Sequence, residues 1–179
     1  AAFRRMADYP GVTEDFRAAW GDEHVPYLVP RRDQPDAALP EPPLTGEAAA
    51  RAWIAGTPPS WCHCTDNALL DTFLPSYDRL THDFYRWTVR LDAGEAGQLV
   101  ERKLGVDLGR IVEIRPLERG LSGRLVRLRI GGERGAITIG KELEIRRALS
   151  PKHLYSSAFV VDAEGPGQRQ PHRIEREAQ

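Results

Sequence analysis

The chain has 179 residues, the length of one ordinary domain with room for a small appendage. Hydrophobic residues make up 41% and charged residues 28%, which excludes wholesale disorder, a collagen-like chain and a coiled-coil rod. The 25 basic and 26 acidic residues leave a formal net charge of -1, so no global field draws the chain to nucleic acid or to an anionic bilayer.

Membrane and export signals are not evident in the residues. No stretch approaches the roughly 18 consecutive apolar residues that a membrane helix requires. Residues 1–9 include Arg4, Arg5 and Asp8 where a signal peptide would have an apolar core. We therefore expect neither a membrane span nor a signal peptide in this chain.

Two segments differ in composition from the rest. Residues 30–43 contain five prolines, each of which removes a backbone donor, so an exposed Pro-rich loop is expected. Residues 163–179 contain Ile174 as their only large apolar residue, which favours a polar, mobile tail or a strand severed from its partner. We expect one domain over residues 1–162, followed by this tail.

The first predicted elements are helices. Thr45 is typical of an N-cap for a short helix that ends at Gly56. Residues 66–74 begin with the capping carboxylate of Asp66 and continue with leucines and a phenylalanine at helical spacing. Pro75 then predicts the end of this second helix.

A strand and a helix follow directly on one another. Residues 84–91 alternate between polar and apolar side chains, with Trp87, Val89 and Leu91 on the apolar side, which predicts a half-buried strand. Asp92 is expected to cap a helix that runs to about Leu104 and carries one apolar stripe.

The remaining elements predict an antiparallel meander. Strands are expected over residues 109–119, 124–130 and 135–140, and the loop over residues 120–123 is of hairpin type. A compact helix over residues 142–149 follows, and the apolar run at 158–161 can return to the sheet. The predicted fold class is α+β, an antiparallel sheet meander with short helices packed on one face.

Cys62 and Cys64 are the only cysteines, and they enclose His63. In an extended backbone the two thiols lie on one side, so they could supply two of the four ligands of a zinc site. The same pair fits two partly buried apolar side chains near a turn, and a redox role is a third alternative. Zinc is therefore a possible cofactor, with no other cofactor indicated.

Acidic residues near aromatic rings could line a saccharide groove. Glu14 precedes Trp20 closely, and a glycosidase or lyase would need one such carboxyl in an apolar pocket. The alternative is that the acids are solvated surface charges and that tryptophans fill the core. Ser122, Ser156 and Ser157 have no accompanying nucleophile elbow, and no phosphate-binding loop is present, so neither serine hydrolase chemistry nor nucleotide binding is indicated.

Three runs carry a resemblance to a known family. They are Glu118-Arg-Gly-Leu-Ser-Gly-Arg124, Thr138-Ile-Gly-Lys-Glu-Leu-Glu-Ile-Arg-Arg-Ala-Leu149 and Leu154-Tyr-Ser-Ser-Ala-Phe-Val-Val161. In this order they resemble the stage II sporulation protein D / LytB amidase-enhancer family, with further similarity at Gly11-Val-Thr-Glu14. Members of that family act on peptidoglycan, as lytic transglycosylases or as enhancers of a wall amidase.

The resemblance implies a site and a location. Thr13 and Glu14 would border a wall-binding cleft together with Trp20, and Cys62 would match a cysteine near a metal site. The Gly-Glu-Met-Pro-like segment that carries the family's catalytic glutamate is not in this chain, so no catalytic residue is assigned. The expected function is that of a partial domain that processes peptidoglycan glycan strands in the cell envelope. A non-catalytic module that binds the wall or activates an amidase is the alternative.

Overall fold

The structure is a computed structural model, and it describes residues 2–8, 12–31, 43–57, 63–64, 66–74, 85–152 and 154–164. The elements follow in the order β1 (Ala2–Asp8), α1 (Phe16–Ala19), α2 (Glu47–Ala55), α3 (Asn67–Phe73), β2 (Arg86–Asp92), α4 (Ala93–Leu104), β3 (Ile111–Arg119), β4 (Leu125–Gly132), β5 (Gly135–Ile139), α5 (Glu142–Ala148) and β6 (Phe159–Glu164).

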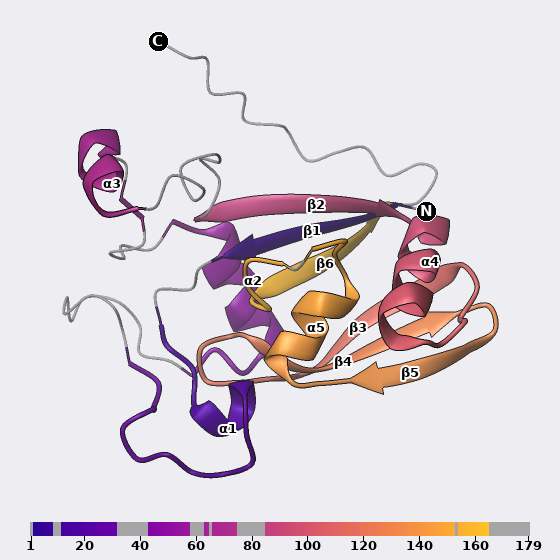
Figure 1. Cartoon of the computed structure of the whole chain (residues 1–179), viewed down its shortest axis with the longest axis horizontal. Helices are drawn as coiled ribbons and strands as arrows, with labels where there is room; N and C mark the ends of the chain where they lie inside the picture. Colours follow the sequence, from indigo (N-terminus) through magenta and orange to yellow (C-terminus); the bar gives the residue numbers. More distant parts are fainter. Residues whose placement is uncertain are drawn as a thin grey trace.

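The strands form two three-stranded antiparallel sheets, in the orders β2-β1-β6 and β3-β4-β5. In Figure 1 the first sheet runs along the upper side of the molecule and the second along the lower side. Met6 in the central strand β1 lies opposite both Thr88 of β2 and Val160 of β6. The first sheet therefore joins segments that are far apart in the sequence.

The main core is built from one face of each sheet and from α4 and α5. Its members are buried aliphatic and aromatic side chains, among them Trp87, Val100, Leu128, Ile145 and Phe159. A smaller cluster of Ala50, Ile54 and Val160 places α2 on the opposite face of β6. Burial of this apolar surface is the main source of stability for a domain of this size.

Helix α4 shows how local sequence positions an element. The side chain of Asp92 accepts hydrogen bonds from the Gly94 and Glu95 amides, and the Glu95 carboxylate accepts one from the Asp92 amide, so both halves of a capping box are present. The hydrogen bond from the Gly94 amide lowers the pKa of Asp92 below its ordinary value. Gly105 ends the helix in the left-handed region, at a φ of 71°.

The α+β class and the elements predicted from residue 46 onward are confirmed. The first predicted helix is capped by Gly46 instead of Thr45. Strand β6 pairs with β1 and does not return to the β3-β4-β5 meander, and it runs to Glu164, beyond the predicted domain end at 162. Strand β1 and helix α1 were not predicted. The interior of the Pro-rich loop (32–42) and residues 165–179 of the tail lie outside the described residues.

Arg119 connects the core to α2 and to the loop over residues 120–123. Its side chain is 2% exposed and donates to the carbonyls of Gly123 at 2.7 Å and Phe159 at 2.9 Å. It also pairs with Glu47 at 2.7 Å. A buried guanidinium keeps its charge only where hydrogen bonds replace its water, and these three contacts do so.

Substitution Arg119→Met is expected to lower the free energy of unfolding by about 3 kcal/mol, because it removes two hydrogen bonds from a charged donor to backbone carbonyls. Urea unfolding followed by circular dichroism measures this change. Glu47→Gln is the matched control, since the Glu47 side chain is 45% exposed, and it should cost less than about 1 kcal/mol. Equal losses of stability in the two variants would contradict the role given to the buried guanidinium.

Candidate functional site

A pocket of about 500 Å³ lies between the segment at residues 12–31, here called the pocket loop, and the body of the domain. The pocket loop contributes Val12, Thr13, Glu14, Phe16, Ala19, Trp20 and Leu28, and the body contributes Arg124, Glu142, Arg146 and Tyr155. The lining is therefore mixed, with aromatic and aliphatic side chains beside two carboxylates and two guanidinium groups.

The pocket loop is closed on itself by Thr13. The Thr13 amide donates to the Arg31 carbonyl at 2.8 Å, and the Thr13 hydroxyl accepts from the Arg31 amide at 2.9 Å and donates to the Val29 carbonyl at 3.0 Å. Further in, the Phe16 amide donates to the Leu28 carbonyl at 3.2 Å. These bonds bring the two ends of the loop together and make it one structural unit.

Helix α1 begins inside the pocket loop because Asp15 caps it. The Asp15 carboxylate accepts from the Arg17 amide at 2.8 Å. The helix ends after one turn, where the Trp20 amide donates to the Phe16 carbonyl. This short helix places Phe16 and Trp20 on the pocket side of the loop.

Glu14 attaches the pocket loop to the turn between β3 and β4, residues 120–123. One carboxylate oxygen accepts from the Ser122 amide at 3.1 Å and from the Ser122 hydroxyl at 2.5 Å. The other accepts from the Asp15 amide at 2.9 Å. A Cβ atom at Gly120 would overlap the Glu14 carboxylate, so the contact with Glu14 needs glycine at this position.

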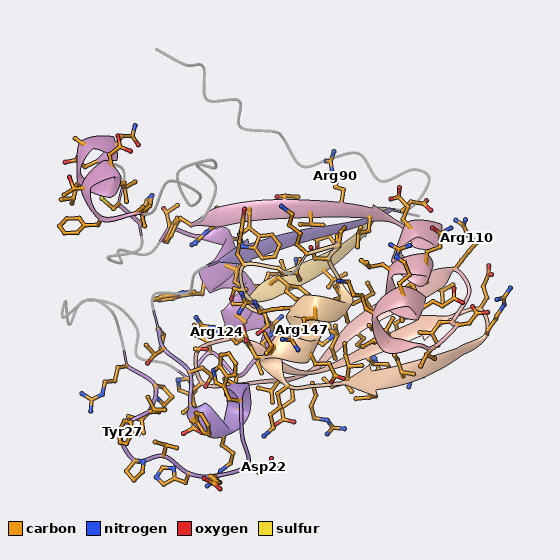
Figure 2. The ribbon with its side chains drawn as sticks, in the orientation of Figure 1. Asp22, Tyr27, Arg90, Arg110, Arg124 and Arg147 are labelled. Atoms are coloured by element: carbon orange, nitrogen blue, oxygen red, sulfur yellow. The ribbon has the colours of Figure 1, made fainter. Side chains whose placement is uncertain are left out.

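Arg124 reinforces the same contact. Its guanidinium donates to the Val12 carbonyl at 2.7 Å and to the Ser122 hydroxyl at 3.0 Å. In Figure 2 Arg124 lies where the pocket loop meets the body, whereas Asp22 and Tyr27 lie along the outer bend of the loop. The base of the pocket is thus held by a network of charged hydrogen bonds.

Helix α5 supplies the opposite wall. Glu142 is buried, and its carboxylate lies 3.5 Å from the Arg146 guanidinium one turn later. Arg146 also donates to the Leu154 carbonyl at 2.6 Å. Both charges on this wall are therefore compensated within the protein.

Aromatic rings lie at the mouth of the pocket. Trp20 is 62% exposed and Tyr155 is 38% exposed, although both line the pocket. Tyr155 meets the buried Trp87 edge to face, with ring centroids 5.8 Å apart. The core tryptophan thus supports the ring of Tyr155, while Trp20 presents its surface to solvent.

A second attachment lies at the outer bend of the pocket loop. Lys141, the N-cap of α5, donates to the Gly21 carbonyl and pairs with the Asp22 carboxylate at 2.6 Å. The hydrogen bond from Lys141 lowers the pKa of Asp22 below its ordinary value, and the charges of Lys141 and Arg17 act in the same direction.

The structure brings Thr13, Glu14 and Trp20 together in this pocket. Sequence reasoning missed the opposite wall of Arg124, Glu142, Arg146 and Tyr155. The only signal for those four was their place in the runs at 118–124, 138–149 and 154–161. Nothing in those runs indicated that they share a pocket with Glu14.

Cys64 is not among the residues that line this pocket. Cys64 contacts the Asp66 carbonyl at 3.9 Å, and His63 stacks on Tyr85 with ring centroids 4.0 Å apart. Within the described ranges, no three His, Cys, Asp or Glu side chains are grouped to hold a metal ion. Cys62 lies outside those ranges, so the zinc site formed with Cys62 and Cys64 stays a prediction.

The fold and the pocket define a small α+β domain with a mixed aromatic and charged site. A family model described as a domain of unknown function (DUF8618) matches residues 14–175, and the chain belongs to that family. No curated protein and no solved structure matches the chain. Among the helices that the structure describes, none is long and apolar enough to cross a bilayer.

The resemblance to the stage II sporulation protein D / LytB amidase-enhancer family is contradicted, because the matching family is DUF8618. The structure gives a local reason for the glycines in two of the three runs that carried the resemblance. Gly120 is required by the approach of Glu14, and Gly123 has a φ of 82° in a tight turn. Gly140 lies against the Val126 carbonyl, where a Cβ atom would not fit. Glycines at such places follow from close packing or from a left-handed turn position and do not define a family.

Substitution Ser122→Ala is expected to lower the free energy of unfolding by about 2 kcal/mol, since it removes a buried hydroxyl donor to a carboxylate. Ser157→Ala is the matched control, because Ser157 is equally buried but its hydroxyl has no hydrogen-bond partner among the described residues. That substitution should be neutral or stabilising. Urea unfolding of both variants measures the difference, and equal effects would mean that the Glu14 contact contributes nothing.

Proposed function

We propose that the pocket binds a neutral sugar unit of a glycan strand, and that the domain is a glycan-binding module without cleavage activity of its own. The observation that carries the proposal is that two solvent-exposed aromatic rings, Trp20 and Tyr155, line a pocket whose two carboxylates and two guanidinium groups sum to zero charge. Binding of this kind depends on no metal ion.

Aromatic rings at the mouth fit the chemistry of sugars. A pyranose ring has an apolar face of C–H bonds with partial positive charge, and the face of an aromatic ring is negative. Its hydroxyl groups both donate and accept, so they suit a wall that offers carboxylate and guanidinium side chains. Glu14, Glu142, Arg124 and Arg146 supply both kinds of group.

The size and the charge of the pocket narrow the ligand class. A volume of about 500 Å³ lies within the range of pockets that hold small molecules. The two carboxylates and two guanidinium groups of the lining sum to zero, so neither a phosphate nor a polycation is favoured. A neutral N-acetylhexosamine unit fits such a lining.

The same carboxylates are poorly placed for catalysis. A general acid must donate a proton to the glycosidic oxygen. Glu14 instead accepts three hydrogen bonds from Ser122 and Asp15, and Glu142 pairs with Arg146. Both groups act as acceptors toward the protein, which supports binding over bond cleavage.

Peptidoglycan glycan strands are the ligand that we propose first, since they contain neutral N-acetylglucosamine units along an extended chain. With this ligand the domain would act at the cell envelope. Chitin oligosaccharides contain the same unit, so they separate recognition of the sugar from recognition of the wall polymer.

Isothermal titration with N-acetylglucosamine oligosaccharides and with denuded peptidoglycan strands is expected to show binding by the wild-type chain. Trp20→Ala should weaken it by at least about tenfold, because the substitution removes an anchoring ring at the mouth. Tyr27→Ala is the matched control, since Tyr27 is a 77% exposed ring of the same loop that does not line the pocket. Absence of wild-type binding to both ligands would reject the proposal.

Incubation of the wild-type chain with denuded glycan strands is expected to release no anhydro-muramyl ends. Mass spectrometry of the strands detects such ends, which mark cleavage by a lytic transglycosylase. Their appearance, and their disappearance in Glu142→Gln, would show that a pocket carboxylate is a catalytic acid, and the binding-only function would then be wrong.

A further inference from the structure

Besides the packing of α1 against α5, polar contacts attach the pocket loop to the rest of the domain at two places that differ in chemical character. At its base, Glu14 and the Val12 carbonyl are held by Ser122 and Arg124. At its outer bend, Gly21 and Asp22 are held by Lys141. Trp20 directly precedes Gly21, so the outer contact lies beside this wall of the pocket.

The base contact is shielded from solvent. Ser122 is fully buried, and its bonds to Glu14 are part-buried, so water competes poorly for these groups. The outer contact is open to solvent on one side, because the side chain of Asp22 is 98% exposed. An exposed ion pair of this kind is weak and is screened by salt.

The loop between these contacts holds together internally. The Thr13 bonds to Val29 and Arg31 and the Phe16 bond to Leu28 lie within the loop and do not involve the body. Opening of the outer contact would therefore leave these bonds and the Glu14 contact in place. The outer bend could then move away from α5 about the base.

We propose that Lys141 is a latch that holds the Trp20 wall of the pocket against α5 and so controls access to the site. Lys141 is a positioning residue, because it acts through Gly21 and Asp22 and does not itself line the pocket. The latch is the contact between Lys141 and the pocket loop, and only its effect on glycan affinity rests on the proposed function.

Hydrogen exchange without ligand tests the latch in the full chain. Lys141→Met and Asp22→Asn should each speed exchange of the amides at the outer bend about two- to fivefold, the range that an exposed ion pair provides. Lys141 makes no side-chain capping bond to α5, so the first substitution leaves the start of that helix unchanged. Lys141→Arg, which keeps the charge, should exchange like the wild type.

Arg51→Met is the matched control, because Arg51 forms an exposed ion pair with Asp162 at 2.8 Å away from the pocket. It should leave exchange in the pocket loop unchanged. Salt at about 1 M should speed the wild type and leave Lys141→Met unaffected, since screening removes only an existing pair. Unchanged exchange in both latch variants, or equal acceleration in the control, would overturn the proposal.

Titration with N-acetylglucosamine oligosaccharides then links the latch to binding. Lys141→Met should weaken affinity several-fold while Trp20 and Tyr155 remain intact. If the wild type binds no sugar but exchange responds as expected, the latch stands and the glycan function fails. If sugar binds and exchange does not respond, the function stands and the latch is wrong.

Discussion

The contact between Glu14 and the β3–β4 turn is the constraint on which the site depends. It requires Gly120 for space and Ser122 for two donors, and Arg124 closes the same network from the end of the turn. Arg119 fixes the turn from the core side through the Gly123 carbonyl. Without this contact the pocket loop would keep only the exposed Lys141 attachment and the packing of α1 against α5, so the hydrogen-bond network at the hairpin turn fixes the base of the pocket.

Most elements could be predicted because their signals are local. The capping box at Asp92 and the alternation through Trp87 are readable within a short stretch of sequence, and both were confirmed. Strand β1 could not be predicted in the same way. Its partners are β2 and β6, which lie far along the chain, and two of its residues are the arginines Arg4 and Arg5. Its place is decided by tertiary pairing, for which the sequence of β1 alone carries no clear signal.

The residues of the candidate site also differ in whether a local sequence signal could reveal them. Thr13, Glu14 and Trp20 are neighbours in sequence, so an acid close to an aromatic ring could be noticed. The other wall comes from segments far along the chain, and Glu142 and Arg146 have the spacing of an ordinary surface ion pair on a helix. Their burial and their place in the pocket with Glu14 are results of folding. The same gap bears on the mistaken family resemblance, because the runs that suggested it include glycines that local packing and a turn already require.

The two polar attachments of the pocket loop have different consequences: the Glu14 contact stabilises the fold, and the proposed Lys141 latch controls access to the pocket. If access required breaking the Glu14 network, each opening would separate the Glu14 carboxylate from the two Ser122 donors. Among the described residues these two donors have no other acceptor, so opening would be costly. The pair between Lys141 and Asp22 can open at small cost, since both groups can be hydrated. A ligand that stacks on Trp20 and reaches α5 would bridge the outer bend and the helix, so binding and closure would stabilise each other. The proposed glycan ligand would suit this arrangement, because a wall that opens at the outer bend would admit an extended chain from the side.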